Sequence, residues 1–383
     1  MHRFLYRRLL LATALCAAPF AAFAHSDGHS LSENALVQPA EVVDCTLENG
    51  DAAKCNAYTV KFIPDGLDIG PFCPATLDDV GGVWDWDGEK AGLYRIDRAY
   101  LEMLAGLGYQ FYDDDGAVNV FDIRVEGPEA DHECIAGTLE TAADMSIRAL
   151  IPITPVMAAS PTPLGTVAKV GMALDGVPIF ADAPSVLDTG HMPALDTCGG
   201  HVDPGGWYHW HATSTDINTV FSAEDVDATC AHVLQDETAQ FGYAFDGFAM
   251  FGSVEGDSAA PVGLDACGGH VGPLPDGSGE AYHYHSSDSF PNLPTCLVGV
   301  VAQDNFSTTA AQGIGSTSGL GGPGGPGGGR PDFSAAAAAL GIDVTALQMA
   351  IEAEGGREAD LAHVAARLGI SLDALQAAMP PRP

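Results

Sequence analysis

One stretch of this sequence occurs twice, and the duplication constrains the fold more than any other feature. In the first copy, the letters LDTCGGH (residues 195–201) are followed by YHWH (208–211). In the second copy, LDACGGH (264–270) is followed by YHYH (282–285). Because the same elements recur in the same order, we interpret the stretch as an internal repeat.

The repeat extends on both sides of these motifs. An Asp-Gly element precedes each copy, at Asp175 and at Asp246, and one cysteine follows each, Cys230 or Cys296. The offset between copies is 71 residues at the Asp-Gly element. We therefore expect the copies to be structurally equivalent, with each Asp-Gly at a tight turn between paired strands.

The repeated motifs resemble those of the YHYH domain family. Its members carry a G-x-x-x-D-G-x-P-I-x segment, then L-D-x-C-x-G-H, then Y-H-Y-H and then a cysteine. The resemblance covers Gly165 to Val301, with Trp210 where the family has Tyr and Ala249 where Pro is usual. The resemblance implies kinship and assigns no chemistry, which has to be argued from the residues.

The histidines of each copy form the pattern of a metal site. A strand places residues i and i+2 on one face, so the two histidines of each tetrad point together. The histidine after each Gly-Gly can turn back toward that strand. Three imidazoles can hold zinc or copper and leave one coordination position open. The six candidate ligands are His201, His209, His211, His270, His283 and His285.

The neighbours of these histidines are candidates for a supporting shell. Asp196 and Asp265 are placed to orient a ligand, and the alternating aromatic residues of the tetrads, Tyr208, Trp210, Tyr282 and Tyr284, lie on the opposite strand face. The two triads can form two sites or meet in one shared site. Histidines buried beside Tyr can also be held by backbone hydrogen bonds alone.

Three functions follow from these alternatives. The first is a metal-binding protein for storage, sensing or delivery of copper or zinc. The second is a hydrolytic or oxidative metalloenzyme, for which the sequence indicates no particular catalytic residue. The third is a metal-free structural or adhesive module in which the histidines hold the fold. A cleft beside a triad with a carboxylate able to act as a base would favour the enzyme. No nucleotide-binding or flavin-binding motif is found.

The first residues predict export. Arg3, Arg7 and Arg8 precede an apolar run that ends in Ala22-Phe23-Ala24, a pattern typical of a signal peptide cleaved after Ala24. We expect Sec export to the periplasm or beyond, with the arginine pair a weaker indication of twin-arginine export. No other stretch is long and apolar enough to span a bilayer. The formal net charge of −36 argues against nucleic acid as a partner.

The cysteine pattern fits an oxidising compartment. Eight cysteines remain once Cys16 in the leader is set aside, which is an even number. The repeat pairs the equivalent cysteines of each copy, giving Cys198–Cys230 and Cys267–Cys296. For the other four we choose Cys45–Cys55 and Cys73–Cys134 among three connectivities. The expected disulfides thus include all eight.

The fold class is mainly β with a small helical tail. We divide the chain into a signal peptide (1–24), a β-rich N-terminal region (25–164), the tandem YHYH domain (165–302), a Gly/Pro linker (303–331) and a helical repeat tail (332–383). We expect removal of residue 313 onward to leave the thermal stability nearly unchanged.

Patterns outside the repeat predict local elements. Asn56 to Ile63 alternates like a strand, Asp97 to Leu107 has one apolar helical face, and Tyr109 to Phe121 reads as a hairpin. Ser222 to Val233 is expected to form a short helix that carries Cys230. In the tail, Asp332 to Ile351 aligns on 360–379, each copy predicting two short helices that could dock a protein partner.

Overall fold

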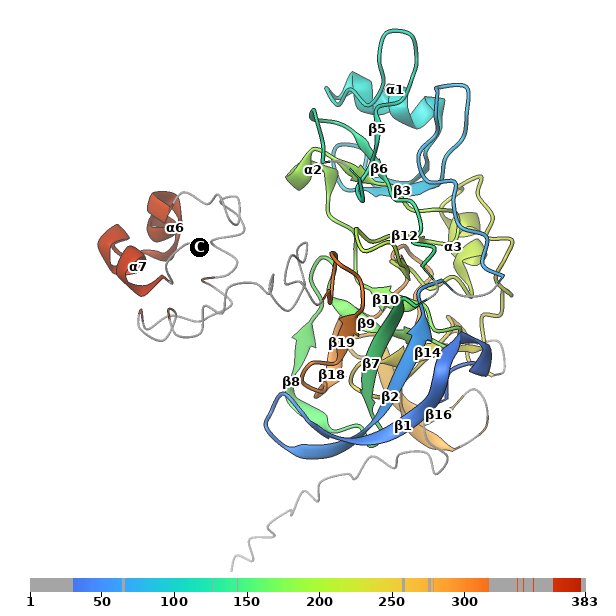
Figure 1. Ribbon diagram of the computed structural model, residues 1–383, viewed down its shortest axis with the longest axis vertical. Coiled ribbons are helices and arrows are strands. Elements are labelled where there is room, and N and C mark those ends of the chain that lie inside the picture. Colours follow the sequence, from blue (N-terminus) through green and yellow to red (C-terminus); the bar gives the residue numbers. More distant parts are fainter. Residues whose placement is uncertain are drawn as a thin grey trace, which may run out of the picture.

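The chain is described by a computed structural model. It describes residues 30–316, apart from 64–65, 126, 143, 257–258, 275–276 and 278, and in the tail residues 336, 340, 347 and 361–379. The protein is mainly β, with a few short helices and a small helical tail, as the sequence predicts (Figure 1). The expected signal peptide lies outside the described residues.

The two sequence copies build the two halves of one eight-stranded sheet. Its order is β12-β13-β10-β9-β14-β15-β17-β16. The first copy contributes β9 (Lys169–Ala173), β10 (Pro178–Phe180), β12 (Gly200–Val202) and β13 (Tyr208–Trp210). The second contributes β14 (Gln240–Ala244), β15 (Ala249–Phe251), β16 (Gly269–Pro273) and β17 (Glu280–His285). Read from either edge to the centre, the order of equivalent strands is the same, which confirms the predicted equivalence of the copies.

The Asp-Gly elements are tight turns between antiparallel strands, as predicted. The first joins β9 to β10 and the second joins β14 to β15. Gly176 and Gly247 have φ of 86° and 94°, which a residue with a Cβ adopts only with strain. The Asp175 carboxylate accepts a hydrogen bond from the Val177 N–H at 3.0 Å, and Asp246 accepts one from Phe248 at 3.2 Å. Each Asp therefore closes its own turn.

Segments from both ends of the described body cover this sheet. A four-stranded sheet has the order β1-β2-β7-β19, and β8 pairs with β18. Their bounds are β1 (Leu36–Thr46), β2 (Ala52–Lys61), β7 (Ser146–Pro152), β8 (Met157–Pro163), β18 (Cys296–Gly299) and β19 (Phe306–Thr308), with the 3-10 turn η1 (Glu33–Ala35) before β1. One hydrophobic core runs from Leu31 to Ile314.

This shared core corrects two of the expected boundaries. The boundary at residue 164 does not separate two bodies, because β18 pairs with β8 and β19 pairs with β7 across it. The expected linker is also too long at its start, since Phe306, Ala310 and Ile314 are buried in the core. Residues 303–316 therefore belong to the folded body.

A second, smaller core lies at one end of the molecule (Figure 1). It packs β3 (Val83–Trp86), β4 (Gly92–Arg95), α1 (Arg98–Gly106), β5 (Val120–Asp122), β6 (Cys134–Ala136), α2 (Val186–Thr189) and β11 (Met192–Pro193). Helix α1 is the helix predicted at 97–107, and the Asp97 side chain caps it by accepting from the Tyr100 N–H. The acidic turn at Asp113 to Gly116 also forms, but only one bridge, Tyr112 to Val118, continues the hairpin.

The helix predicted at Ser222 to Val233 is wrong in position. The structure has α3 (Ile217–Ala223), whose apolar side chains Ile217, Val220 and Phe221 are buried at helical spacing. Ser222 lies near its end, and Cys230 lies in the following loop. Burial of the apolar face, which the capping pattern did not register, decides where this helix forms.

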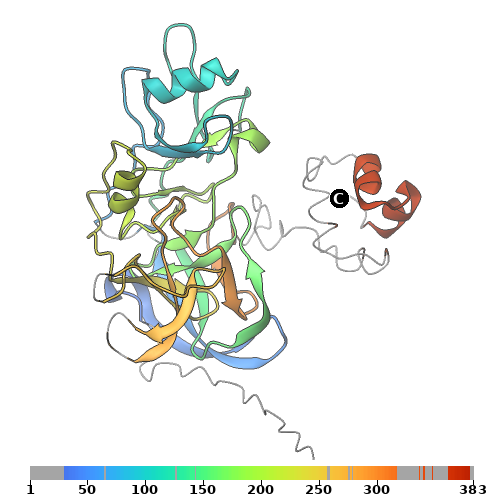
Figure 2. The same cartoon turned by 180° about the vertical axis from the view of Figure 1, so that it is seen from behind.

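The described part of the tail agrees with the sequence pattern. Helices α6 (Leu361–Leu368) and α7 (Leu372–Ala378) are joined at Gly369, and the Ser371 side chain caps α7. Both views draw this pair apart from the β body (Figures 1 and 2). Most of the first tail copy lies outside the described residues. Within the part of the chain that is described, no helix is long and apolar enough to cross a membrane.

Candidate metal centres

Strand register brings the histidines of each copy together. In the first copy, His201 on β12 lies directly opposite His209 on β13. In the second copy, His270 on β16 lies opposite His283 on β17. The remaining histidine of each tetrad is two residues further along and so shares the same face. We call the groups triad 1 (His201, His209 and His211) and triad 2 (His270, His283 and His285).

The triads form two separate centres. Triad 1 lies at one end of the eight-stranded sheet and triad 2 at the other, with β10, β9, β14 and β15 between β13 and β17. Five strand spacings correspond to about 24 Å along the sheet. The ligand atoms of each group, by contrast, lie within 4.8 Å of one another. The sequence left open whether the histidines form one site or two, and the strand order gives two.

Triad 1 is a compact triangle of nitrogen atoms. The Nε2 atoms of His201 and His209 are 3.1 Å apart, those of His209 and His211 are 3.0 Å apart, and those of His211 and His201 are 3.1 Å apart. Zinc–nitrogen bonds are about 2.0–2.1 Å long, so one ion can contact all three atoms from one side of the triangle. The fourth position then remains open.

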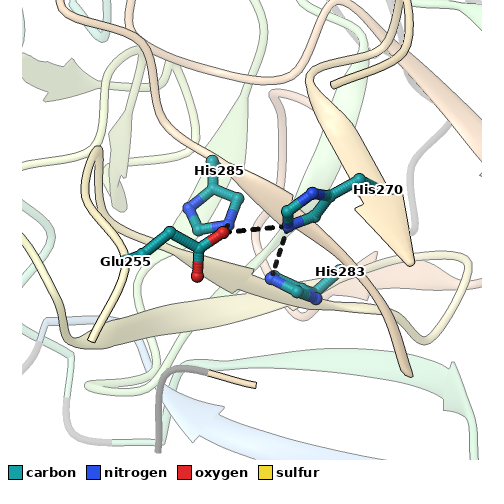
Figure 3. Close-up of side chains that lie close together, drawn as sticks. All are labelled: Glu255, His270, His283 and His285. Atoms are coloured by element: carbon teal, nitrogen blue, oxygen red, sulfur yellow. Dashed lines mark hydrogen bonds and ion pairs between the residues drawn. The ribbon is translucent and has the colours of Figure 1, made fainter. Parts of the chain in front are cut away.

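Triad 2 includes a fourth group, Glu255, which sequence reasoning missed (Figure 3). The Glu255 Oε1 atom is 3.2 Å from His270 Nε2 and 3.7 Å from His285 Nε2. His270 Nε2 is also 3.2 Å from His283 Nε2. Glu255 lies outside the repeated motifs, and the residue 71 positions earlier is Pro184. No sequence signal therefore pointed to this carboxylate.

Backbone carbonyls fix the orientation of the imidazoles. His211 Nδ1 is 2.7 Å from the Ala181 carbonyl oxygen, and the equivalent His285 Nδ1 is 2.8 Å from that of Gly252. A carbonyl oxygen can only accept, so each of these Nδ1 atoms must carry the hydrogen. In a neutral imidazole the Nε2 atom then has a free lone pair, which is the state a metal ligand needs.

The histidines after the Gly-Gly turns are held in the same way. His201 Nδ1 is 3.2 Å from the Pro193 carbonyl oxygen, and His270 Nδ1 is 2.9 Å from that of Val262. These two acceptors occupy the same place in the two copies, as the Ala181 and Gly252 carbonyls do. The duplication has therefore preserved the support of the imidazoles as well as the imidazoles themselves.

The copies differ at the first histidine of the tetrad. His283 Nδ1 is 3.1 Å from the carbonyl oxygen of Ala281. His209 Nδ1 is buried and has no hydrogen-bond partner in the described part of the chain. Its ring lies instead against Phe180 and Trp207, with ring centroids 5.2 Å and 4.9 Å away. Only in triad 1 is one imidazole without a carbonyl to fix its hydrogen.

Burial favours the uncharged form of the three imidazoles of triad 1 and of His285. Loss of solvation lowers the pKa of His201 to about 4. It also lowers the pKa values of His209 and His211 well below the usual range, and neighbouring imidazoles add to the effect. Burial lowers the pKa of His285 too, although the Glu255 charge opposes this. Neutral imidazoles at pH 7 are the form that can coordinate a metal.

Asp196 and Asp265 do not orient the imidazoles, contrary to expectation. The Asp196 carboxylate accepts hydrogen bonds from the Cys198 N–H at 2.9 Å and from the Tyr208 hydroxyl at 2.8 Å. Asp265 accepts from the Cys267 N–H at 2.8 Å and from the Tyr282 hydroxyl at 3.0 Å. Both carboxylates therefore close the Cys-Gly-Gly-His turn and clamp it to the tetrad strand. The carbonyl oxygens orient the rings.

The aromatic residues of the tetrads lie on the other face of the strands, as expected. Tyr284 donates its hydroxyl to Asp246 at 2.6 Å and accepts from the Val298 N–H at 2.8 Å. Trp210 replaces this tyrosine in the first copy and packs edge-on against Tyr208. These side chains contact the turns and the core.

Two glycines make the close approach of each turn to its strand. Gly199 and Gly268 have φ of 82° and 80°. A Cβ on the following Gly200 or Gly269 would overlap the Tyr208 or Tyr282 hydroxyl. The first glycine of each pair is therefore needed for the backbone turn. The second is needed because the tyrosine hydroxyl that binds Asp196 or Asp265 lies against it.

The cysteines beside the triads form disulfides. The bonds are Cys198–Cys230, Cys267–Cys296, Cys45–Cys55 and Cys73–Cys134, the four pairs that the sequence predicts. Cys198 and Cys267 each precede a Gly-Gly-His segment, so these two bonds anchor the turns that carry His201 and His270. As disulfide sulfurs they are not thiolate ligands for the centres.

Fold and site together define a class: a duplicated β protein with a clamped turn and three convergent imidazoles in each half. The chain carries a YHYH domain, since residues 148–262 match the model of the family described as YHYH protein. The match covers the first copy and ends at Val262, before the LDACGGH and YHYH motifs of the second. No curated protein and no solved structure matches the chain.

Proposed function

We propose that this protein is an exported metal-binding protein that holds copper or zinc at its two His triads, for storage, sensing or delivery. The observation that carries the proposal is the geometry of triad 2. Its three Nδ1 atoms face carbonyl oxygens, so its three Nε2 lone pairs and the Glu255 carboxylate converge with no hydrogen between them. Electron pairs brought this close repel one another unless a cation lies among them.

The metal-free structural role accounts less well for this geometry. Buried polar atoms in folded proteins nearly always have a hydrogen-bond partner. His285 Nε2 is buried, and in the described structure it has none. A purely structural histidine would be expected to use both ring nitrogens. A metal ion would satisfy His285 Nε2 and the other three ligand atoms together.

Export is supported by the cysteine chemistry. Four disulfides are typical of proteins from oxidising compartments. The net charge of −36 would also concentrate cations near the surface. Imidazole ligands suit copper and zinc. A carboxylate beside imidazoles, as at triad 2, is also a usual ligand set for zinc.

A metal-dependent hydrolase is the second candidate, and Glu255 is the observation that favours it. Its side chain is 23% exposed, so its carboxylate can reach both solvent and an ion held by triad 2. A carboxylate in that position can accept a proton from a metal-bound water. Hydrolysis of a panel of ester and phosphoester substrates by the zinc-loaded protein, abolished in Glu255→Gln, would favour this candidate over simple binding.

Elemental analysis tests the proposal most simply. The full chain, purified without a polyhistidine tag, is incubated with copper and zinc salts and then freed of unbound metal. We expect up to two ions per chain, and none in a variant with both His209→Ala and His283→Ala. Absence of metal from the correctly folded parent would contradict the proposal.

A further inference from the structure

We infer that the two centres are unequal metal sites: triad 2 with Glu255 is the tighter site and fills first, whereas triad 1 is a weaker site whose loading requires His209 to change its tautomer. This inference rests on the proposed metal binding. It concerns the order and strength of loading, and it follows from where the hydrogen of each imidazole must lie.

Triad 2 is already in the ligand state. Carbonyl oxygens of Val262, Ala281 and Gly252 hold a hydrogen on each Nδ1 atom, so every Nε2 atom presents a lone pair. Glu255 adds a negative charge 3.2 Å from His270 Nε2. Binding a divalent ion here requires no rearrangement of hydrogens, and the carboxylate attracts the ion and partly neutralises it.

The Nε2 atom of His209 can find a hydrogen-bond partner inside triad 1 without a metal. A neutral His209 has one ring hydrogen, and no acceptor lies at its Nδ1 atom in the described structure. On Nε2, that hydrogen points to His211 Nε2 at 3.0 Å or to His201 Nε2 at 3.1 Å, both of which are acceptors. One hydrogen inside the triangle therefore replaces the repulsion with a hydrogen bond. In triad 2 each neutral imidazole already has its hydrogen on Nδ1, so the same relief would need an additional proton.

Loading triad 1 therefore has a cost that loading triad 2 does not have. The metal needs the lone pair of His209 Nε2, so the hydrogen must move to Nδ1, where it faces Phe180 and Trp207. An unpaired buried donor weakens the bound state, which corresponds to a loss of roughly 10- to 100-fold in affinity. The missing carboxylate lowers the affinity of triad 1 further.

The two copies differ in the contact between the first tetrad histidine and the carbonyl two residues before it. The carbonyl two residues before His283 is that of Ala281, which accepts from its Nδ1. The carbonyl two residues before His209 is that of Trp207, which accepts from the Asp203 N–H at 2.9 Å in the tight turn between β12 and β13. In the described structure, His209 Nδ1 makes no hydrogen bond to that carbonyl.

Titration of the full chain with cobalt(II) tests the inference with one probe and two readouts. Cobalt replaces zinc in such sites, and its visible absorption reports ions held at either triad. Trp207 and Trp210 lie beside triad 1, so quenching of tryptophan fluorescence reports triad 1. We expect the first equivalent to raise the absorption with little quenching, and the second to quench at a 10- to 100-fold higher free cobalt concentration.

Three variants assign the two phases. His283→Ala should remove the first phase and leave the quenching phase. Glu255→Gln, which preserves the side-chain shape, should weaken the first phase about 10-fold and leave the second unchanged. Glu280→Gln, an exposed glutamate on the same strand β17, is the matched control and should change neither phase.

The outcomes are distinguishable. Quenching that saturates with the first equivalent, or two phases of equal affinity, would overturn the inferred order and leave metal binding itself intact. An unchanged first phase in Glu255→Gln would also overturn it. No cobalt or zinc binding in the folded parent would overturn the proposed function and the inference together.

Discussion

The two halves of the large sheet share a scaffold but differ in what surrounds the imidazoles. In both halves the Asp-Tyr clamp, the Gly-Gly turn, the disulfide and two of the carbonyl acceptors occupy equivalent positions. In the first half, aromatic rings enclose the triad and leave His209 Nδ1 without a partner. In the second, a partly exposed carboxylate, Glu255, completes the group.

The residues that position the imidazoles therefore differ from the residues that set their metal affinity. The repeated motif supplies three imidazoles on one face, and residues outside the motif decide the charge and the hydrogen positions at the centre. A duplicated centre can thus diverge in affinity without any change in its histidines.

Removal of one ligand should have the largest effect. His285→Ala removes an imidazole whose Nε2 atom faces the other ligands of triad 2, and we expect the affinity for zinc at that site to fall by more than the roughly 10- to 100-fold typical of losing an outer partner. His363→Ala on α6 is the matched control. Competition with a zinc chelator measures the zinc affinity of both variants. Equal affinities in His285→Ala and His363→Ala would show that triad 2 does not bind the metal.

Truncation near the end of the body should affect the first half alone. Gln312 donates to the Pro204 carbonyl at 2.9 Å, and the Ile314 N–H donates to Asp203 at 3.2 Å, both in the turn between β12 and β13. Ending the chain after Ala311 removes these contacts and the buried Ile314 side chain. We expect the melting temperature to fall by about 4–8 °C.

Ending the chain after Ser316 should leave the melting temperature nearly unchanged. The start of the removable segment thus moves by four residues, from Gly313, which composition suggested, to residue 317. Loss of cobalt binding at triad 2 in the protein that ends at Ala311 would show that the two halves are not independent. An equal loss of melting temperature in both truncations would show that the stabilising contacts lie after Ser316.

The two clamps should differ in their contribution to stability. Asp196 is buried, whereas the equivalent Asp265 is exposed. Tyr208→Phe leaves the buried carboxylate without a hydroxyl donor, and we expect it to lower the free energy of unfolding by about 2–3 kcal/mol. Tyr282→Phe should cost about 1 kcal/mol or less, since water can replace its hydroxyl. Urea unfolding measures both, and equal losses would contradict the difference in burial.

The smallest expected effect is that of moderate acid on triad 1. Burial lowers the pKa of His201 to about 4 and those of His209 and His211 well below the usual range. A group with a lowered pKa stays neutral until the pH approaches that value, so protons should not compete with the metal above it. We expect the affinity of triad 1 to change by less than about 2-fold between pH 7 and pH 5.5.

Triad 2 should lose affinity earlier over the same range. The Glu255 charge opposes the lowering of the pKa of His285, so protonation there competes sooner. Titrations at several pH values measure both phases. A steep loss of metal affinity at triad 1 as the pH falls, with no loss at triad 2, would contradict this expected order.

The sequence predicted most of what the repeat itself contains. The i, i+2 spacing of the tetrads predicted the shared face of His209 and His211, and the equivalence of the copies predicted Cys198–Cys230 and Cys267–Cys296. Both follow from local geometry or from the repeat. Helix α1 was predicted for the same reason, since its apolar face and its Asp97 cap are local signals.

Non-local features could not be predicted. Glu255 reaches triad 2 because the loop after β15 folds over β17, and no spacing rule relates it to His270. The distance between the triads depends on strand order, which the motif does not encode. The place of β19 in the N-terminal sheet was missed because Phe306 lies close to a Gly-rich stretch. Helix α3 was misplaced because tertiary burial of Phe221 outweighed a capping pattern.

Anomalous X-ray scattering at the zinc edge would test the central claim most directly. Crystals of the full chain grown with one equivalent of zinc should give one strong anomalous peak bounded by the Nε2 atoms of His270, His283 and His285 and by the Glu255 carboxylate. Further zinc should add a second peak at triad 1. A first peak at triad 1, or zinc bound only away from both triads, would contradict the account.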